Sequence, residues 1–152
     1  MITQPSAPRI LEVLQQALTE TVLPAVTDPV AIATVEMVKQ VLGTLAIRAE
    51  HEIAWLVEET ESLEALGASI LSSHPGSARV AAALDGARAS TTGSLLLSEV
   101  SARYSRASEI LSCAVEEVPL DSERRADIEA ALDARLAHEL QVIGDFQLVG
   151  RT

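Results

Sequence analysis

The stretch of residues 29–73, PVAIATVEMVKQVLGTLAIRAEHEIAWLVEETESLEALGASILSS, decides the fold. It begins at Asp28-Pro29, a capping residue followed by a proline in the first helical turn, and the next firm breaker is Pro75-Gly76. Apolar or small residues recur at spacings of three and four, which places them on one helical face. This face carries Leu42, Ala46, Ala49, Ile53, Leu56, Thr60, Leu63, Gly67 and Ile70. The stretch therefore predicts one unusually long helix.

The length of this helix is compatible with two arrangements. At 1.5 Å per residue it would extend roughly 65–70 Å, whereas a compact domain of this size has a radius of gyration of about 15 Å. We therefore expect that the helix either breaks, near Gly43 or around residues 58–61, or projects and packs on a second subunit. The sequence leaves both arrangements open.

Four further helices are expected, at about residues 8–23, 77–89, 94–118 and 121–146. Ser6 can cap the first, Pro24 ends it, and Pro119 ends the fourth of the five. Helix 94–118 has the most regular apolar stripe, made of Leu97, Val100, Tyr104, Ala107, Leu111, Ala114 and Val118. The stripe expected in helix 121–146 is Ile128, Leu132, Leu136, Leu140 and Ile143. Because the loops are short, we predict an all-α, four- to five-helix antiparallel bundle with one long second helix, in a single domain, 1–152.

Composition excludes several classes of partner. The chain has 152 residues and a net charge of 11 − 22 = −11, with one lysine, Lys39. This charge argues against nucleic acid and anionic membrane. The apolar stretch of residues 30–49 is interrupted by Glu36, Lys39 and Arg48, so a membrane span is not expected. The first ten residues have no apolar signal core, and Cys113 is the only cysteine, so a cytoplasmic protein without a disulfide framework is expected.

Histidines are the first candidates for chemistry. His51 and His138 fall in different predicted helices and could face each other, with help from neighbouring glutamates, as ligands of one metal ion. His74 lies near the end of the long helix, too far along it to join them. The alternative is that all three histidines are solvated or stabilise a helix end. No Glu-x-x-His pair occurs, so the di-iron pattern of ferritin-like bundles is absent.

Acidic and aromatic residues are the second group of candidates. Glu52 and Glu59 are seven positions apart in the long helix, share a face and flank its apolar seam. Paired carboxylates can bind a ligand or act as acid and base, although an acidic solvated face is the simpler interpretation. Aromatic residues make up only 2% of the chain, so Trp55 and Tyr104 are candidates for a ligand pocket or an interface. Burial of Trp55 in the core is the alternative.

Nucleophile and cofactor motifs are missing from the sequence. It contains no Gly-x-Ser-x-Gly, Ser-x-x-Lys, phosphate-binding loop or Gly-x-Gly-x-x-Gly motif. An ordinary enzyme is therefore disfavoured, and no cofactor is expected.

The front of the chain resembles a known family. Leu11-x-x-Leu14 leads into Glu20-Thr-Val-Leu-Pro-Ala25, and a long helix containing Val41-Leu42, Leu45-Ala46 and Arg48 follows. Residues 8–65 are thus similar to small uncharacterised helical bacterial proteins that accompany phosphotransferase-like kinases and acyl-CoA dehydrogenases. An Asn-Ala-Leu element associated with that family is replaced here by Val41-Leu42-Gly43. The resemblance implies an accessory or partner-binding role and supplies no catalytic residues.

These observations favour a non-enzymatic helical accessory or interaction module. We expect it to self-associate as a homodimer, through the long helix or helix 94–118, with a protein partner as a further option. One alternative is a bundle that binds a small apolar or acyl-type ligand in its interior, because a core poor in aromatic rings can leave cavities. The other is a mononuclear metal enzyme that uses His51 and His138.

Overall fold

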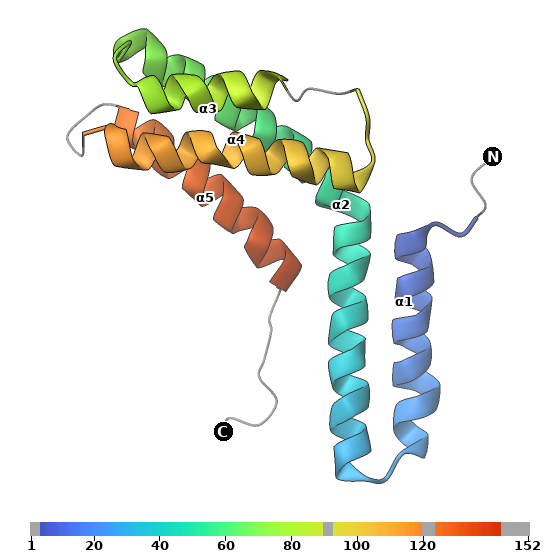
Figure 1. Ribbon diagram of the computed structural model, residues 1–152. Helices are drawn as coiled ribbons and strands as arrows, with labels where there is room; N and C mark the ends of the chain where they lie inside the picture. Colours follow the sequence, from blue (N-terminus) through green and yellow to red (C-terminus); the bar gives the residue numbers. More distant parts are fainter. Residues whose placement is uncertain (1–3, 90–92, 120–123, 144–152) are drawn as a thin grey trace. The chain divides into compact units, whose positions relative to one another are not determined.

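The computed structural model describes residues 4–89, 93–119 and 124–143, and its fold is all-α (Figure 1). Five α-helices and no strand occur among these residues, which confirms the predicted fold class of a helical bundle with one long helix. The outer parts of the expected helix 121–146, residues 121–123 and 144–146, lie outside the described ranges. So does most of the loop expected at residues 90–94.

Contacts divide the chain into two compact units, and each is described by itself. The N-terminal unit comprises Met1–Glu52 with Glu139–Thr152, and the core unit comprises Ile53–His138. The single domain expected from the sequence stays a prediction.

Helix α2 (Pro29–Ser73) is continuous over 45 residues and contributes to both units. Neither Gly43 nor residues 58–61 break it, so the continuous alternative is the one observed. Its start is explained by Asp28, whose side chain accepts a hydrogen bond from the backbone N–H of Ala31 at 2.9 Å. Its end is explained by Pro75, two residues beyond Ser73, because the residue before a proline is disfavoured in helical geometry.

The Asp28 cap gives a direct test of the start of α2. We expect Asp28→Ala to cost about 1 kcal/mol of unfolding free energy, since a donor of the first turn loses its acceptor. Ser6 occupies the corresponding position before α1 but makes no side-chain capping bond. Ser6→Ala is therefore the matched control and should change stability by less than about 0.5 kcal/mol. Urea unfolding followed by circular dichroism measures the stability of both variants. An equal loss of unfolding free energy in Asp28→Ala and Ser6→Ala would contradict the role of Asp28 as the cap of α2.

In the N-terminal unit, α1 (Ala7–Ala17) lies beside the first half of α2 (Figure 1). α1 continues into a π-helical turn (η1, Leu18–Val22) and a 3-10 turn (η2, Leu23–Ala25). Pro24 has no N–H to donate, so regular α-helical bonding stops there. The Gln15 side-chain amide donates to the carbonyl of Lys39 at 3.1 Å and lies over Gly43. Absence of a side chain at Gly43 thus makes room for Gln15 between the two helices.

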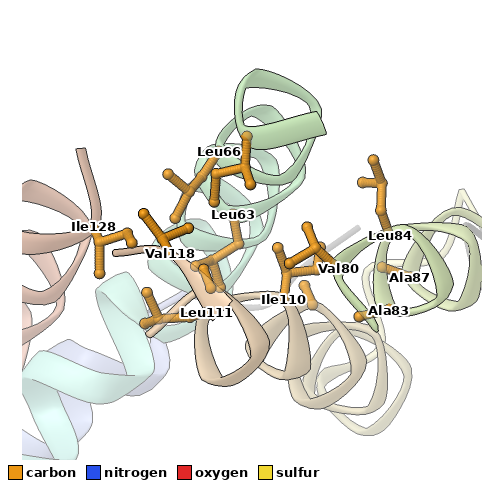
Figure 2. Close-up of a cluster of buried hydrophobic side chains, with 13 residues drawn as sticks. Leu63, Leu66, Val80, Ala83, Leu84, Ala87, Ile110, Leu111, Val118 and Ile128 are labelled. Carbon is orange, nitrogen blue, oxygen red and sulfur yellow. The ribbon is translucent and has the colours of Figure 1, made fainter. Parts of the chain in front are cut away.

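The core unit contains the second part of α2 with α3 (Ala78–Ala89), α4 (Leu97–Glu117) and most of α5 (Arg124–Ile143). Thirteen buried apolar residues form one cluster, most of them drawn and labelled in Figure 2. They are Leu63, Leu66, Ile70, Val80, Ala83, Leu84, Ala87, Ala107, Ile110, Leu111, Ala114, Val118 and Ile128. Thr60 is also buried, and its hydroxyl donates a hydrogen bond to the carbonyl of Leu56 at 2.6 Å, so this buried polar group is satisfied.

Gly67 is the point of closest approach in this core. A Cβ atom built on Gly67 would lie 2.9 Å from Cγ2 of Ile110 and 3.5 Å from Cδ1 of Leu84. Ile110 belongs to α4 and Leu84 to α3, so a residue without a side chain lets α2 touch both helices at once. An ion pair between Arg103 and Glu64, at 2.9 Å, adds a polar contact between α4 and α2.

The apolar stripe expected on α5 is wrong in most of its members. Ile128 is fully buried, but Leu132, Leu136, Leu140 and Ile143 are exposed. α5 instead turns Ala131, Ala134, Arg135 and His138 toward a cleft that it shares with α2. Small alanine side chains permit closer approach of two helices than leucines do, which accounts for the choice of this face.

Candidate functional site

The candidate site joins α2 to α5 inside the core unit. Trp55 and Glu59 are one turn apart on α2, so their side chains leave the helix on the same side. Nδ1 of His138, on α5, lies 2.7 Å from Oε1 of Glu59. The His138 imidazole also stacks on the Trp55 ring, with 4.8 Å between centroids and 15° between planes. The Glu59 and His138 side chains are only 13% and 18% exposed, so water screens this contact weakly.

Tyr104 on α4 and Arg135 on α5 extend the site. The Arg135 guanidinium lies over the Tyr104 ring, 5.2 Å from its centroid, which is the geometry of a cation–π contact. Tyr104 also packs against the edge of the apolar cluster. A carboxylate, an imidazole and a guanidinium from α2 and α5 therefore line one cleft, and the Tyr104 phenol of α4 contacts two of them, Glu59 and Arg135.

The cleft itself is small. Its volume is about 40 Å³, and polar and apolar residues both line it: Glu58, Glu59, Ser62, Leu63, Leu111, Ala131, Ala134, Arg135 and His138. A buried water needs roughly 10–15 Å³ measured in this way. The cleft can therefore admit a few water molecules, and it has no room for a metabolite or an acyl chain.

The environment of Tyr104 favours its neutral form. Burial of the phenol, followed by the hydrogen bonding and negative charge of Glu59, raises the pKa of Tyr104, and the positive charge of Arg135 opposes this only partly. A phenol with a raised pKa keeps its proton under all ordinary conditions and cannot serve as a ready base.

This raised pKa predicts an alkaline loss of stability. The folded protein holds the phenol proton more tightly than the unfolded chain does. The contribution of this proton to the unfolding free energy is therefore fully present below the unfolded pKa of about 10. It is lost as the pH rises from there through the folded pKa. We expect the wild type to lose more unfolding free energy above pH 10 than Tyr104→Phe, which has no proton to release. Because Tyr104 is the only tyrosine, phenolate absorbance follows it alone, and a midpoint at the ordinary value would contradict the prediction.

The structure thus brings together four of the residues singled out in the sequence: Trp55, Glu59, Tyr104 and His138. Glu52 belongs to the N-terminal unit and accepts hydrogen bonds from Arg48. His51 belongs to the same unit and lies 3.9 Å from a carboxylate oxygen of Glu50. His74 stands after the last turn of α2, with Nδ1 3.1 Å from the Ser73 hydroxyl.

Metal chemistry gains no support from the described parts of the chain. They contain no group of three or more His, Cys, Asp or Glu side chains that could hold a metal ion. His138 uses Nδ1 to contact Glu59, and one carboxylate with one imidazole falls short of the ligand set of a zinc site. The metal-enzyme alternative therefore has no observation in its favour.

Sequence reasoning did not single out Arg135 or Glu58. Arg135 and His138 are three positions apart on α5, so their common face was detectable from spacing alone. What spacing could not show is that this polar face, rather than the leucine stripe beside it, turns toward α2.

Comparisons with family models, with curated proteins and with solved structures find no match to this chain. The resemblance of residues 8–65 to a bacterial helical family stays a prediction.

Proposed function

We propose that this protein is a non-enzymatic interaction module that self-associates as a dimer through its α1–α2 hairpin. The hairpin is defined as α1 with its following turns and the first half of α2, residues 7–49. The observation that carries the proposal is a second apolar stripe on α1, exposed and separate from the stripe that faces α2.

Helix α1 has three distinct faces. Leu11 and Gln15 are partly covered, and the Gln15 side chain bonds to α2. At 100° per residue, a second face carries Ile10, Val13, Leu14 and Ala17, all exposed. A third face is polar, with Arg9, Glu12 and Gln16. A two-helix hairpin needs one apolar face per helix, whereas each helix of a four-helix bundle packs against two neighbours. The extra apolar face of α1 is the one such a bundle requires.

The first half of α2 carries a matching exposed stripe. Val30, Met37, Val38, Val41 and Leu45 recur at helical spacing, and Val30 is 74% exposed. The stripe ends where Arg48 pairs with Glu52 one turn later. Within the described hairpin, Ala46 is the one buried residue. Two helices with a single buried alanine lack a core of their own, and pairing of two hairpins would supply one.

Charge is compatible with self-pairing of this surface. Residues 1–49 contain three basic and four acidic residues, so their net charge is 3 − 4 = −1, and the remaining −11 + 1 = −10 lies in residues 50–152. Two copies can therefore bring their hairpins together without strong repulsion. Contact between the more acidic remaining parts of two chains would be opposed by repulsion.

A membrane is the competing partner for the same surface. Among the described residues, α2 is long and apolar enough to cross a bilayer, with an 18-residue window of mean hydropathy 1.6 that is not buried. A second copy is favoured over a membrane because the hairpin contains charged residues. Glu36 and Lys39 of α2 pair at 3.0 Å, and one face of α1 is also charged. Charged groups are costly in hydrocarbon but can face water in a bundle. Flotation of the protein with lipid vesicles would favour the membrane instead.

Cysteine cross-linking tests the proposed surface directly. In a Cys113→Ser background, Val41→Cys places a thiol in the middle of the exposed α2 stripe, and Gln16→Cys places one on the polar face of α1. A flexible bis-maleimide applied to dilute protein should convert Val41→Cys into a covalent dimer in high yield and leave Gln16→Cys mostly monomeric. Equal yields at both positions would contradict the proposal.

The apolar-ligand alternative finds less support. The larger groove between α2 and α5, of about 510 Å³, is open to solvent and lined mainly by small residues of both helices: Ser62, Ala65, Leu66, Ser69, Arg124, Asp127, Ala130, Ala131 and Ala134. It therefore differs from the enclosed interior cavity that this alternative expects.

A further inference from the structure

The contact of His138 with Glu59 and Trp55 has two components that respond to the same proton. Glu59 can accept a hydrogen bond from Nδ1 of His138 at 2.7 Å, and the imidazole stacks on Trp55 at 4.8 Å. Both residues belong to α2, so His138 fastens α5 to α2 at this point. This inference rests on the core unit alone and is independent of the proposed dimer.

In the imidazolium form, both components are strong. Nδ1 carries a proton, and the hydrogen bond to a carboxylate is charge-assisted, which makes it roughly twice as strong as a neutral one. A positively charged ring stacked on an indole also gains a cation–π attraction.

In the neutral form, both components weaken. The imidazole has one N–H and must choose which nitrogen carries it. If Nδ1 is unprotonated, a lone pair faces the Glu59 carboxylate, and the cation–π attraction is lost in either tautomer.

The titratable and charged groups around His138 come from all three helices of the site. α2 contributes Glu58 and Glu59, and α5 contributes Arg135. α4 contributes Tyr104, whose phenol stays neutral because its pKa is raised by burial and then by Glu59. The Arg135 guanidinium lies over the Tyr104 ring.

We propose that His138 is a proton-operated clamp between α2 and α5, closed on Glu59 and Trp55 when the imidazole is charged and loosened when it is neutral. The ligand of this site is the proton itself, and the moving part is the α5 segment that carries His138.

Trp55 fluorescence tests the clamp in the full-length protein, because Trp55 is the only tryptophan. A charged imidazole stacked on an indole quenches its emission. In a titration from acid to alkaline pH, we expect emission to rise in one sigmoidal step as the imidazole loses its proton. His138→Gln should abolish the step, and the matched control His74→Gln should keep it. Glu59→Gln should reduce its amplitude severalfold, since the charged ring is then no longer held against Trp55.

Three outcomes would overturn the proposal: no step in the wild type, an unchanged step in His138→Gln, or a step lost only in His51→Gln, one turn before Trp55. Circular dichroism at the two ends of the pH range verifies that each variant is folded. If His138→Gln does not fold, Glu59→Gln decides alone: a full-amplitude step would overturn the proposal.

Discussion

Replacing Gly67 by valine is expected to destabilise the protein by about 2–3 kcal/mol. The new Cβ would lie 2.9 Å from Cγ2 of Ile110, and valine adds two methyl groups beyond it. Ile110 is fully buried and its Cγ2 is attached directly to a β-branched carbon, so it has little freedom to move aside. Overpacking of this kind costs typically 1–3 kcal/mol, and the better helix propensity of valine over glycine offsets only a fraction of that.

Gly86 provides the matched control in the same unit. It lies in the last turn of α3, is exposed, and has no atom within 4 Å of where a side chain would begin. Gly86→Ala should therefore stabilise the protein, by up to about 1 kcal/mol, through helix propensity alone. Urea unfolding measures the free energy of unfolding of both variants, which should fall in Gly67→Val and rise in Gly86→Ala. A neutral Gly67→Val would mean that α2, α3 and α4 do not meet as closely as described.

Replacing Leu45 by glutamate is expected to weaken self-association at least about 100-fold. Leu45 is exposed on the α2 stripe, where a second hairpin would cover it. Burying an unpaired carboxylate in such an interface costs several kcal/mol, and each 1.4 kcal/mol is a tenfold change in the dissociation constant. Sedimentation velocity over a concentration series measures this change.

Leu136→Glu is the control for this substitution. Leu136 is likewise an exposed leucine in a helix, but it lies on α5, outside the hairpin. Its replacement should leave the dissociation constant unchanged within about threefold, because a surface substitution away from the interface costs little. Circular dichroism confirms that both variants stay helical. Dissociation by Leu136→Glu and not by Leu45→Glu would place the interface on α5 and contradict the proposed surface.

The core-unit parts of the α2 and α4 stripes could be predicted from the sequence, whereas Ala49 and Ile53 of the expected α2 seam and Leu97 of the expected α4 stripe are exposed. The spacing of Thr60, Leu63, Gly67 and Ile70 on α2 identifies residues that are buried in the structure. On α4, the stripe through Ala107, Leu111 and Ala114 does the same. These predictions succeed because a helix with neighbours on one side must present one apolar face, and helical periodicity reports that face directly.

The packing of α5 could not be predicted in this way. Its leucines have the same periodicity as a buried stripe, yet Leu132 and Leu136 are exposed while Ala131 faces the cleft. Periodicity indicates that a face is apolar and does not indicate what covers it. Ile110 was missed for a related reason, since it stands beside the regular stripe and is buried by α3 and Gly67.

The candidate site was predictable only in its local half. Trp55 and Glu59 are four residues apart, so a shared face follows from the sequence. His138 is 79 positions from Glu59, and their contact depends on the angle at which α5 crosses α2. Trp55, Glu59, Tyr104 and His138 were therefore selected by residue type, whereas their contacts across helices result from tertiary packing.

The molar mass of the wild-type protein in solution tests the central claim most directly. Light scattering coupled to size-exclusion chromatography, run over a wide concentration range, should return twice the chain mass of 16.1 kDa, about 32 kDa, with dissociation only on strong dilution. A mass of 16 kDa at every concentration would contradict the claim that the α1–α2 hairpin pairs with a second copy.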